Sequence, residues 1–167
     1  MNFTFKQIKK EQLNLVLELF KKSAEKIDKK NINHWQYWKN PPIEKINWVK
    51  EGISLKEFFF IYNETNENIG MIRIMNQDLL YWGKQKDKAK YIHSFVIKEA
   101  FNGKGFGQLI IENIEKLAKE ENCKFLRLDS DSKNPKLCKF YENLDFQKVG
   151  EKKLLLSNYN LYEKKLF

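Results

Sequence analysis

Cysteine, histidine and long hydrophobic runs are scarce in this sequence. Its 167 residues include two histidines and two cysteines, Cys123 and Cys138, and none of them has the spacing of a metal site. We therefore expect free thiols, no metal and a reducing, cytoplasmic setting. The longest apolar runs, such as Phe58–Tyr62, are too short to cross a membrane, and the first residues lack the apolar core of a signal peptide.

Repeats, long linkers and low-complexity segments are also missing, which favours a single domain over residues 1–167. A hydrophobic content of 42% with 14% aromatic residues excludes a disordered chain. The net charge of +9 favours polyanionic partners, either nucleic acid or a phosphorylated cofactor. The lysines are dispersed, however, so we expect most of them to form a solvated surface.

The hydrophobic pattern predicts an order of β-α-α-β-β-β-α-β-α-β-β. Helices are expected over 11–29, 43–52, 106–121 and from Asn134-Pro135 onward, with Gly52 ending the second. Strands are expected over 2–8, 57–62, 69–75, 90–97, 125–129, 146–149 and 154–164. The strand–helix–strand unit over 91–129 should have parallel strands, whereas the hairpins should be antiparallel. The sequence therefore predicts an α/β (α+β) fold with a mixed, mostly antiparallel sheet of about seven strands and helices on both faces.

The most informative segment, Tyr91–Gln108, combines a buried strand, a glycine-rich turn and the start of a helix. Gly103, Gly105 and Gly107 allow the backbone to turn tightly and to approach a ligand closely. Backbone N–H groups at a helix start are unpaired, and the helix dipole adds positive potential there. This combination is typical of a phosphate site, so we expect a phosphorylated cofactor.

Two other interpretations of this turn stay open on this evidence alone. The turn would serve equally as a tight connection that binds nothing. A dinucleotide (Rossmann) site would need a third glycine where Gln108 stands, and an acidic residue such as Asp129 about 20 positions further on. Residues 98–102 also separate the strand from the turn, which counts against the dinucleotide interpretation.

The order of elements and two motifs resemble the GNAT superfamily of acyl-CoA-dependent N-acetyltransferases over most of the chain. The family's cofactor motif, Q/R-x-x-G-x-G/A, falls on residues 102–107, with Asn102 in the place of Gln or Arg. The second motif is an Asn followed seven residues later by a Tyr, and then by Gly-Phe. Asn134, Tyr141 and Asp145-Phe146 occupy these places, with Asp145 replacing the glycine.

The resemblance implies that acetyl-CoA is the cosubstrate. Its pantetheine arm would pair with the strand backbone over 95–97 and with Asn134, and its pyrophosphate would lie on the amides of 102–108. Lys104 or Lys139 would meet phosphate charge, although a solvated surface role suits either lysine as well. The implied cofactor-binding residues are Phe95, Val96, Ile97, Asn102, Gly103, Lys104, Gly105, Phe106, Gly107, Gln108, Asn134, Lys139 and Tyr141.

The implied reaction is acetyl transfer to a primary amine of a small molecule or peptide by direct attack on the thioester. An alkyl ammonium with a pKa of about 10.4 must first lose a proton. His93 is the candidate base and matches a histidine used in the serotonin N-acetyltransferase branch of the family. A structural histidine, with deprotonation through water, is the alternative. Tyr141 matches the family tyrosine that protonates the leaving thiolate, although its size also suits core packing.

Aromatic residues are concentrated in two regions that wall the acceptor site in many family members. Trp35 and Trp38 follow the first helix, and Tyr81 and Trp82 lie in the connection over 75–89. Aromatic faces can hold a cationic amine, so these four residues are candidate substrate contacts. Packing beneath a loop is the alternative role.

Two other functions remain to be separated from catalysis. A non-catalytic acyl-CoA-binding protein of the same fold would keep the glycine turn but would not need Tyr141 or His93. A nucleic-acid-binding protein would cluster its basic residues with stacking aromatics, and the lysines here are scattered. Homodimers are common in the family, although no segment of this sequence demands one.

Overall fold

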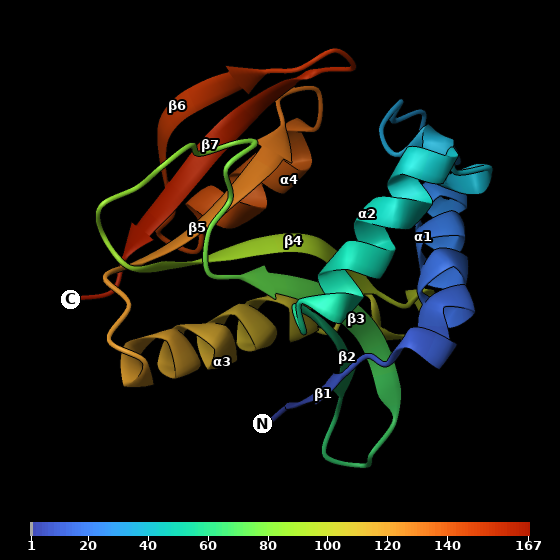
Figure 1. Cartoon of the computed structure of the whole chain (residues 1–167), viewed down its shortest axis with the longest axis horizontal. Coiled ribbons are helices and arrows are strands. Elements are labelled where there is room, and N and C mark those ends of the chain that lie inside the picture. The colour runs from blue at the N-terminus through green and yellow to red at the C-terminus, as the bar shows by residue number, and fades with distance from the viewer. Residues whose placement is uncertain (1) are drawn as a thin grey trace. The chain divides into compact units, whose positions relative to one another are not determined.

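The computed structural model describes residues 2–167, and the predicted order of strands and helices is confirmed (Figure 1). The strands are β1 (Thr4–Gln7), β2 (Phe58–Tyr62), β3 (Asn68–Met75), β4 (Ala89–Ile97), β5 (Phe125–Asp131), β6 (Gln147–Lys153) and β7 (Asn158–Lys165). The helices are α1 (Leu13–Asp28), α2 (Ile43–Ser54), α3 (Phe106–Glu120) and α4 (Pro135–Glu142), with short 3-10 turns η1 (Lys10–Gln12), η2 (Gln36–Lys39) and η3 (Glu99–Phe101). No helix within residues 2–167 is both long and apolar enough to cross a membrane.

The strands form one mixed sheet of seven strands in the order β1-β2-β3-β4-β5-β7-β6. The pairs β1–β2, β2–β3, β5–β7 and β6–β7 are antiparallel. The pair β4–β5 is parallel, as predicted for the strand–helix–strand unit, and its register runs from Ala89 opposite Phe125 to Ile92 opposite Leu128. The expected mixed, mostly antiparallel sheet is therefore confirmed.

The chain divides into two compact units. The first contains the residues up to Arg73 together with Ser94–Gly107. Its core forms because α1 carries apolar residues at helical spacing, and Val16, Phe20 and Ala24 are fully buried. Figure 1 shows α2 beside α1, and helix α2 contributes further buried side chains to this core.

The second unit contains Ile74–His93 and Gln108–Phe167. The inward stripe of α3 is Ile110, Ile111, Ile114 and Ala118, as its helical spacing predicts. A partly buried ion pair joins β5 to β7, with Arg127 Nε 2.6 Å from Glu163 Oε2. Cys123 and Cys138 are buried free thiols, in agreement with the sequence.

Several element boundaries differ from the prediction, and β6, expected over 146–149, continues to Lys153. Helix α2 continues to Ser54, and Gly52 lies buried inside it instead of ending it. A Cβ at Gly52 would lie 2.7 Å from Phe58 Cε2 and 2.8 Å from Arg73 Cζ, so close packing explains this glycine. β7 begins only at Asn158, because residues 154–157 form the turn that closes the β6–β7 hairpin.

Candidate active site

The glycine turn lies in the first unit, between η3 and α3. Gly103 and Gly105 have φ values of +72° and +74°, which other residues adopt only with strain. A Cβ at either position would meet no atom within 4 Å, so the surroundings of both α carbons are open. Helix α3 begins at Phe106, directly after the second of these glycines. The turn therefore combines a glycine-dependent backbone with the unpaired N–H groups of a helix start.

The end of β4 is held tightly in the first unit. Gly70 of β3 is so close to this strand that a Cβ on it would lie 2.0 Å from the carbonyl oxygen of Val96. Lys98 donates its backbone N–H to the carbonyl of Ile69 at 2.8 Å. Lys104 Nζ lies 5.3 Å from the Phe101 ring centroid, as a cation over an aromatic face.

Helix α4 belongs to the second unit and begins where Asn134-Pro135 predicts. The Asn134 side chain is the N-cap and accepts the N–H of Leu137 at 3.2 Å. Tyr141 is 6% exposed, and burial together with the charge of Asp129 raises the pKa of its phenol. Tyr141 is thus protonated throughout the physiological pH range. Lys139 is largely exposed and lies 3.8 Å from Glu142.

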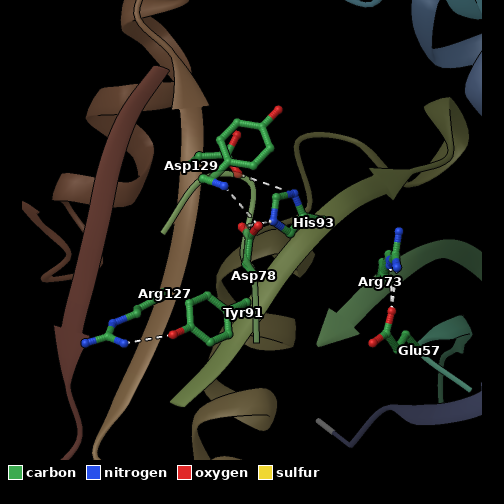
Figure 2. Close-up of polar contacts among 8 residues, drawn as sticks. Glu57, Arg73, Asp78, Tyr91, His93, Arg127 and Asp129 are labelled. Carbon is green, nitrogen blue, oxygen red and sulfur yellow. Dashed lines mark hydrogen bonds and ion pairs between the residues drawn. The ribbon is translucent and has the colours of Figure 1, made fainter. Parts of the chain in front are cut away.

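His93 contacts two carboxylates in the second unit (Figure 2). Its Nε2 lies 2.8 Å from Asp78 Oδ2, and its Nδ1 lies 3.3 Å from Asp129 Oδ1. The second contact has the distance of an ion pair but not the geometry of a hydrogen bond, so Asp129 Oδ1 has no hydrogen-bond partner. Asp78 Oδ1 accepts the backbone N–H of Tyr81 at 3.1 Å. These three side chains are 4–11% exposed, which makes the cluster a largely buried one.

The β4–β5 register explains why His93 and Asp129 meet. Ile92 and Leu128 are the last paired residues of these parallel strands, and His93 and Asp129 are the residues that follow them. Directly after His93, Ser94 adopts a φ of +53°, a strained value for a residue with a side chain. Such strain inside a strand is typical of functional sites.

Burial is the main cause that raises the pKa of Asp129 from 3.8 to about 6. The positive charge of a protonated His93 opposes this rise, whereas the charges of Asp78 and Asp131 add to it. Burial and the nearby carboxylates also raise the pKa of Tyr159 to about 12. The cluster therefore holds a carboxyl group that titrates close to neutral pH.

The same three side chains are the set within residues 2–167 whose ligand atoms lie close enough for a metal ion, within 4.8 Å of one another. Carboxylate and imidazole groups suit several divalent metals. In the present arrangement His93 Nε2 is hydrogen-bonded to Asp78, so we assign no metal ligands here.

The predicted aromatic contacts have different surroundings. Trp38 is 2% exposed and stacks on Phe20 with ring centroids 3.9 Å apart, and Trp35 packs edge-on against the same ring at 5.6 Å. These two tryptophans therefore contribute to the core of the first unit. Tyr81 lies in the second unit with its ring centroid 5.3 Å from that of His93.

Trp82 covers Arg127, whose Cζ lies 5.0 Å from the indole centroid.

The sequence did not reveal Asp78 as a site residue, because no local pattern distinguishes it from other aspartates in polar connections. It identified Asp129 only as the acidic residue that a dinucleotide site would need.

Three solved structures with the same fold are acetyltransferases. A GNAT family acetyltransferase from Listeria monocytogenes 4b F2365 has 23% identity and a TM-score of 0.77, covering 98% of this chain and 94% of the other. Aminoglycoside acetyltransferase AAC(6')-Ib, solved with coenzyme A and kanamycin, has 14% identity and a TM-score of 0.74 over 98% and 95%. The spermidine/spermine N-acetyltransferase SpeG from Vibrio cholerae has 16% identity and a TM-score of 0.64 over 99% and 95%.

These likenesses show that the chain shares the fold of these three structures. No curated protein is detectably similar in sequence. Residues 18–146 match the family model of the acetyltransferase (GNAT) family, which is more than half of the chain. The chain belongs to the acetyltransferase (GNAT) family, and the resemblance inferred from its two motifs is confirmed.

Proposed function

We propose that this protein is an N-acetyltransferase that moves an acetyl group from acetyl-CoA to a primary amine. The observation that carries the proposal is the glycine turn ahead of α3. Gly103 and Gly105 combine left-handed backbone with open space, and Phe106 begins the helix directly afterwards. A pyrophosphate would accept hydrogen bonds from the backbone N–H groups of this turn, where the helix dipole favours negative charge.

The remaining cofactor contacts follow the family pattern. The pantetheine arm would pair with the backbone of Phe95–Ile97, as an added strand does. Asn134 uses its Oδ1 to cap α4, so a bond to pantetheine would come from its Nδ2 donor. A location in the cytoplasm fits the two free thiols.

Starting from an ammonium, the reaction removes two protons from nitrogen and supplies one to sulfur. An ammonium loses a proton, and the nitrogen lone pair then attacks the thioester carbonyl carbon. The C–S bond breaks, the electrons of that bond leave with sulfur, and the new amide nitrogen loses its second proton. A backbone N–H near Phe95 would stabilise the oxyanion. His93 is the proposed base for the first step.

Tyr141 is the proposed partner of the leaving sulfur. Because its pKa is raised, the phenol is protonated and ready to donate. A thiol has a pKa of about 8.5, so complete proton transfer from this phenol to a thiolate is uphill. Tyr141 would therefore act mainly by a hydrogen bond to the sulfur as charge develops on it.

The proposed acceptor is a small molecule or peptide with a primary amine. Structural neighbours named for spermidine and aminoglycoside acetylation support a small-molecule amine.

The first test is thermal unfolding with acetyl-CoA, free CoA and NAD, followed by thiol release with a panel of amines. Saturation at about 100 times the Kd stabilises a protein by ~2.7 kcal/mol. A higher Tm with both CoA species, unchanged with NAD, together with amine-dependent thiol release is expected. Binding without thiol release for any amine would indicate a non-catalytic acyl-CoA-binding protein. No change with either CoA species would contradict the proposal.

The matched variant in this test is Tyr141→Phe, which keeps the ring and removes the hydroxyl. We expect its kcat to fall by 10- to 1,000-fold with little change in KM for acetyl-CoA, because the bond to sulfur forms only as the thiolate leaves.

A further inference from the structure

One oxygen of the His93 cluster has no hydrogen-bond partner although it is buried. Asp129 Oδ1 accepts no hydrogen bond, and its side chain is 10% exposed. Buried polar atoms are nearly always hydrogen-bonded, so an orphan of this kind needs an explanation. The atom that faces it is His93 Nδ1, at 3.3 Å (Figure 2).

Asp78 decides which nitrogen of His93 carries a proton. An ionised carboxylate only accepts hydrogen bonds, so the 2.8 Å contact with Asp78 Oδ2 assigns a proton to His93 Nε2. Asp78 is itself fixed, because its side chain is 4% exposed and its Oδ1 accepts the N–H of Tyr81. In the neutral imidazole, Nδ1 is therefore an acceptor, and it lies 3.3 Å from the carboxylate oxygen of Asp129 without the alignment of a hydrogen bond. Two acceptors therefore lie close together, and a donor that reaches both of them would relieve their repulsion.

The surroundings favour a positively charged donor. The titratable and charged groups around the His93–Asp129 pair are Asp78 and Tyr81 in the β3–β4 connection, Asp131 on β5, Tyr141 on α4, Tyr159 on β7 and His93 itself on β4. Of these groups, only His93 can carry a positive charge. A protein of net charge +9 thus has a local concentration of buried carboxylates here. The Tyr81 ring, 5.3 Å from the His93 ring, supplies an aromatic wall for a cation.

We propose that Asp129 is a catalytic residue that hydrogen-bonds the ammonium of an alkylamine acceptor, that the His93–Asp129 pair accepts its proton, and that Asp78 is a positioning residue for His93. This inference rests on the proposed acetyltransferase function and names the acceptor class as an alkylammonium. An N–H bond of the ammonium breaks, its electrons stay on nitrogen as the attacking lone pair, and the proton is shared by His93 Nδ1 and Asp129 Oδ1. The proton passes to solvent before the next turnover.

The proton transfer from the ammonium is unfavourable at equilibrium, but the following step can draw it forward. An alkylammonium has a pKa of about 10.4 and Asp129 has a pKa of about 6, so transfer to this carboxylate leaves about one bound amine in 10⁴ deprotonated at equilibrium. Attack on the thioester consumes the free amine as it forms. The pair must begin the reaction without its shared proton, so activity should rise as pH passes through the titration of the pair.

The kinetic test compares Asp129→Asn, Asp129→Glu and Asp78→Asn with Asp87→Asn. Asp87 is the matched control, because it lies in the same connection but is exposed and pairs with Lys124. With acetyl-CoA and n-butylamine or spermidine, D129N should lower kcat/KM by at least about 100-fold and abolish the rise with pH. D78N should lower it about 10-fold, D129E should recover part of the loss, and D87N should match the wild type. KM for acetyl-CoA should not change in any variant.

A second readout does not depend on turnover. The chain has two histidines, so His34→Asn identifies the His93 signals in an NMR titration. Removing the neighbouring carboxylate should move the His93 midpoint to lower pH by about one unit in D129N and leave it unchanged in D87N. Adding n-butylammonium should shift the His93 signals of the wild type but not those of D129N.

The outcomes separate the two proposals. Wild-type protein that binds no CoA would contradict the acetyltransferase function, whatever the histidine signals do. Acetyl transfer that persists in D129N within about threefold of the wild type would overturn the role of Asp129. Loss of wild-type activity on dialysis against EDTA would overturn it too, because a metal ion would then occupy the place assigned to the ammonium.

Discussion

Gly70 of β3 lies against the carbonyl group of Val96 in β4 so closely that no side chain fits between the two strands. A Cβ added at Gly70 would be 2.0 Å from Val96 O and 3.0 Å from Val96 C. Neither atom can move away cheaply, because both belong to the backbone. The glycine therefore determines the position of the strand segment that is proposed to pair with pantetheine.

We expect Gly70→Ala to destabilise the protein severely, by ~3 kcal/mol or more, because β4 must be displaced to admit the methyl group. Urea unfolding followed by circular dichroism would measure this loss. Gly150→Ala is the control, since its Cβ would make only an ordinary contact of 3.7 Å with Leu161 Cδ1. Equal midpoints for the two variants would show that the close approach at Gly70 is unimportant.

Two glycine variants can separate the effect of backbone strain on stability from an effect on cofactor binding. Gly105→Ala and Gly83→Ala both place a Cβ on left-handed backbone, with φ +74° and +62°, and neither Cβ meets an atom within 4 Å. Each should therefore lose a similar ~1 kcal/mol of stability. Only G105A should raise the Kd for CoA, by at least about tenfold, because its methyl group projects where the pyrophosphate is proposed to lie. Isothermal titration calorimetry decides this, and the same Kd in both variants would count against a phosphate site at the turn.

The ion pair of Arg127 and Glu163 should contribute to the free energy of unfolding in a way that depends on both partners, so that removing one of them costs more than removing both. Arg127→Met leaves the Glu163 carboxylate without its cation, and we expect a loss of ~3 kcal/mol in the free energy of unfolding. The double variant Arg127→Met/Glu163→Met should recover much of this loss, because apolar side chains of similar size leave no uncompensated charge. Double variants no more stable than R127M would contradict this account.

Tyr91→Phe tests the other contact of the same guanidinium. It removes the hydroxyl that accepts from Arg127 Nη1 at 2.8 Å, and a loss of ~1 kcal/mol is expected. Chemical denaturation of both variants under one condition gives the comparison. A loss in Y91F as large as that in R127M would mean that the hydroxyl, and not the ion pair, provides most of the stabilisation.

Because its pKa is raised by burial, Asp129 should make the free energy of unfolding fall as pH rises. Its pKa is about 6 in the folded protein and 3.8 ordinarily, so between about pH 4 and 6 the folded state binds more protons than the unfolded state. Folding is favoured below this window, and the advantage is lost as pH rises through about 6. The difference in pKa corresponds to ~3 kcal/mol.

Asp129→Asn should therefore be more stable than the wild type at pH 8, and the two curves should converge toward pH 4. Urea midpoints across pH 4 to 8 measure this, with D87N as the control expected to follow the wild type. Parallel curves for D129N and the wild type would refute a buried carboxylate with a raised pKa.

Much of the fold could be predicted because its causes are local. The helical spacing of apolar residues predicts α1 and α3, and Asn134-Pro135 predicts the start of α4 from capping chemistry. The prediction that Gly52 ends the second helix is wrong. In a sequence, a glycine that ends a helix looks the same as a glycine that allows another side chain to pack closely against the helix. Only the approach of Phe58 and Arg73 distinguishes the two cases.

The candidate site likewise has one part that local sequence predicts and one part that it does not. Residues 102–107 carry the pattern that predicts a phosphate site in consecutive positions, so sequence by itself determined the glycine turn, as well as the family and the order of strands and helices. The meeting of His93 with Asp78 and Asp129 joins residues that are 15 and 36 positions apart. It depends on the β4–β5 register and on the path of the β3–β4 connection, which are set by packing between distant segments. Only the tertiary structure decides such contacts, because no local spacing rule encodes the register of two strands separated by a helix.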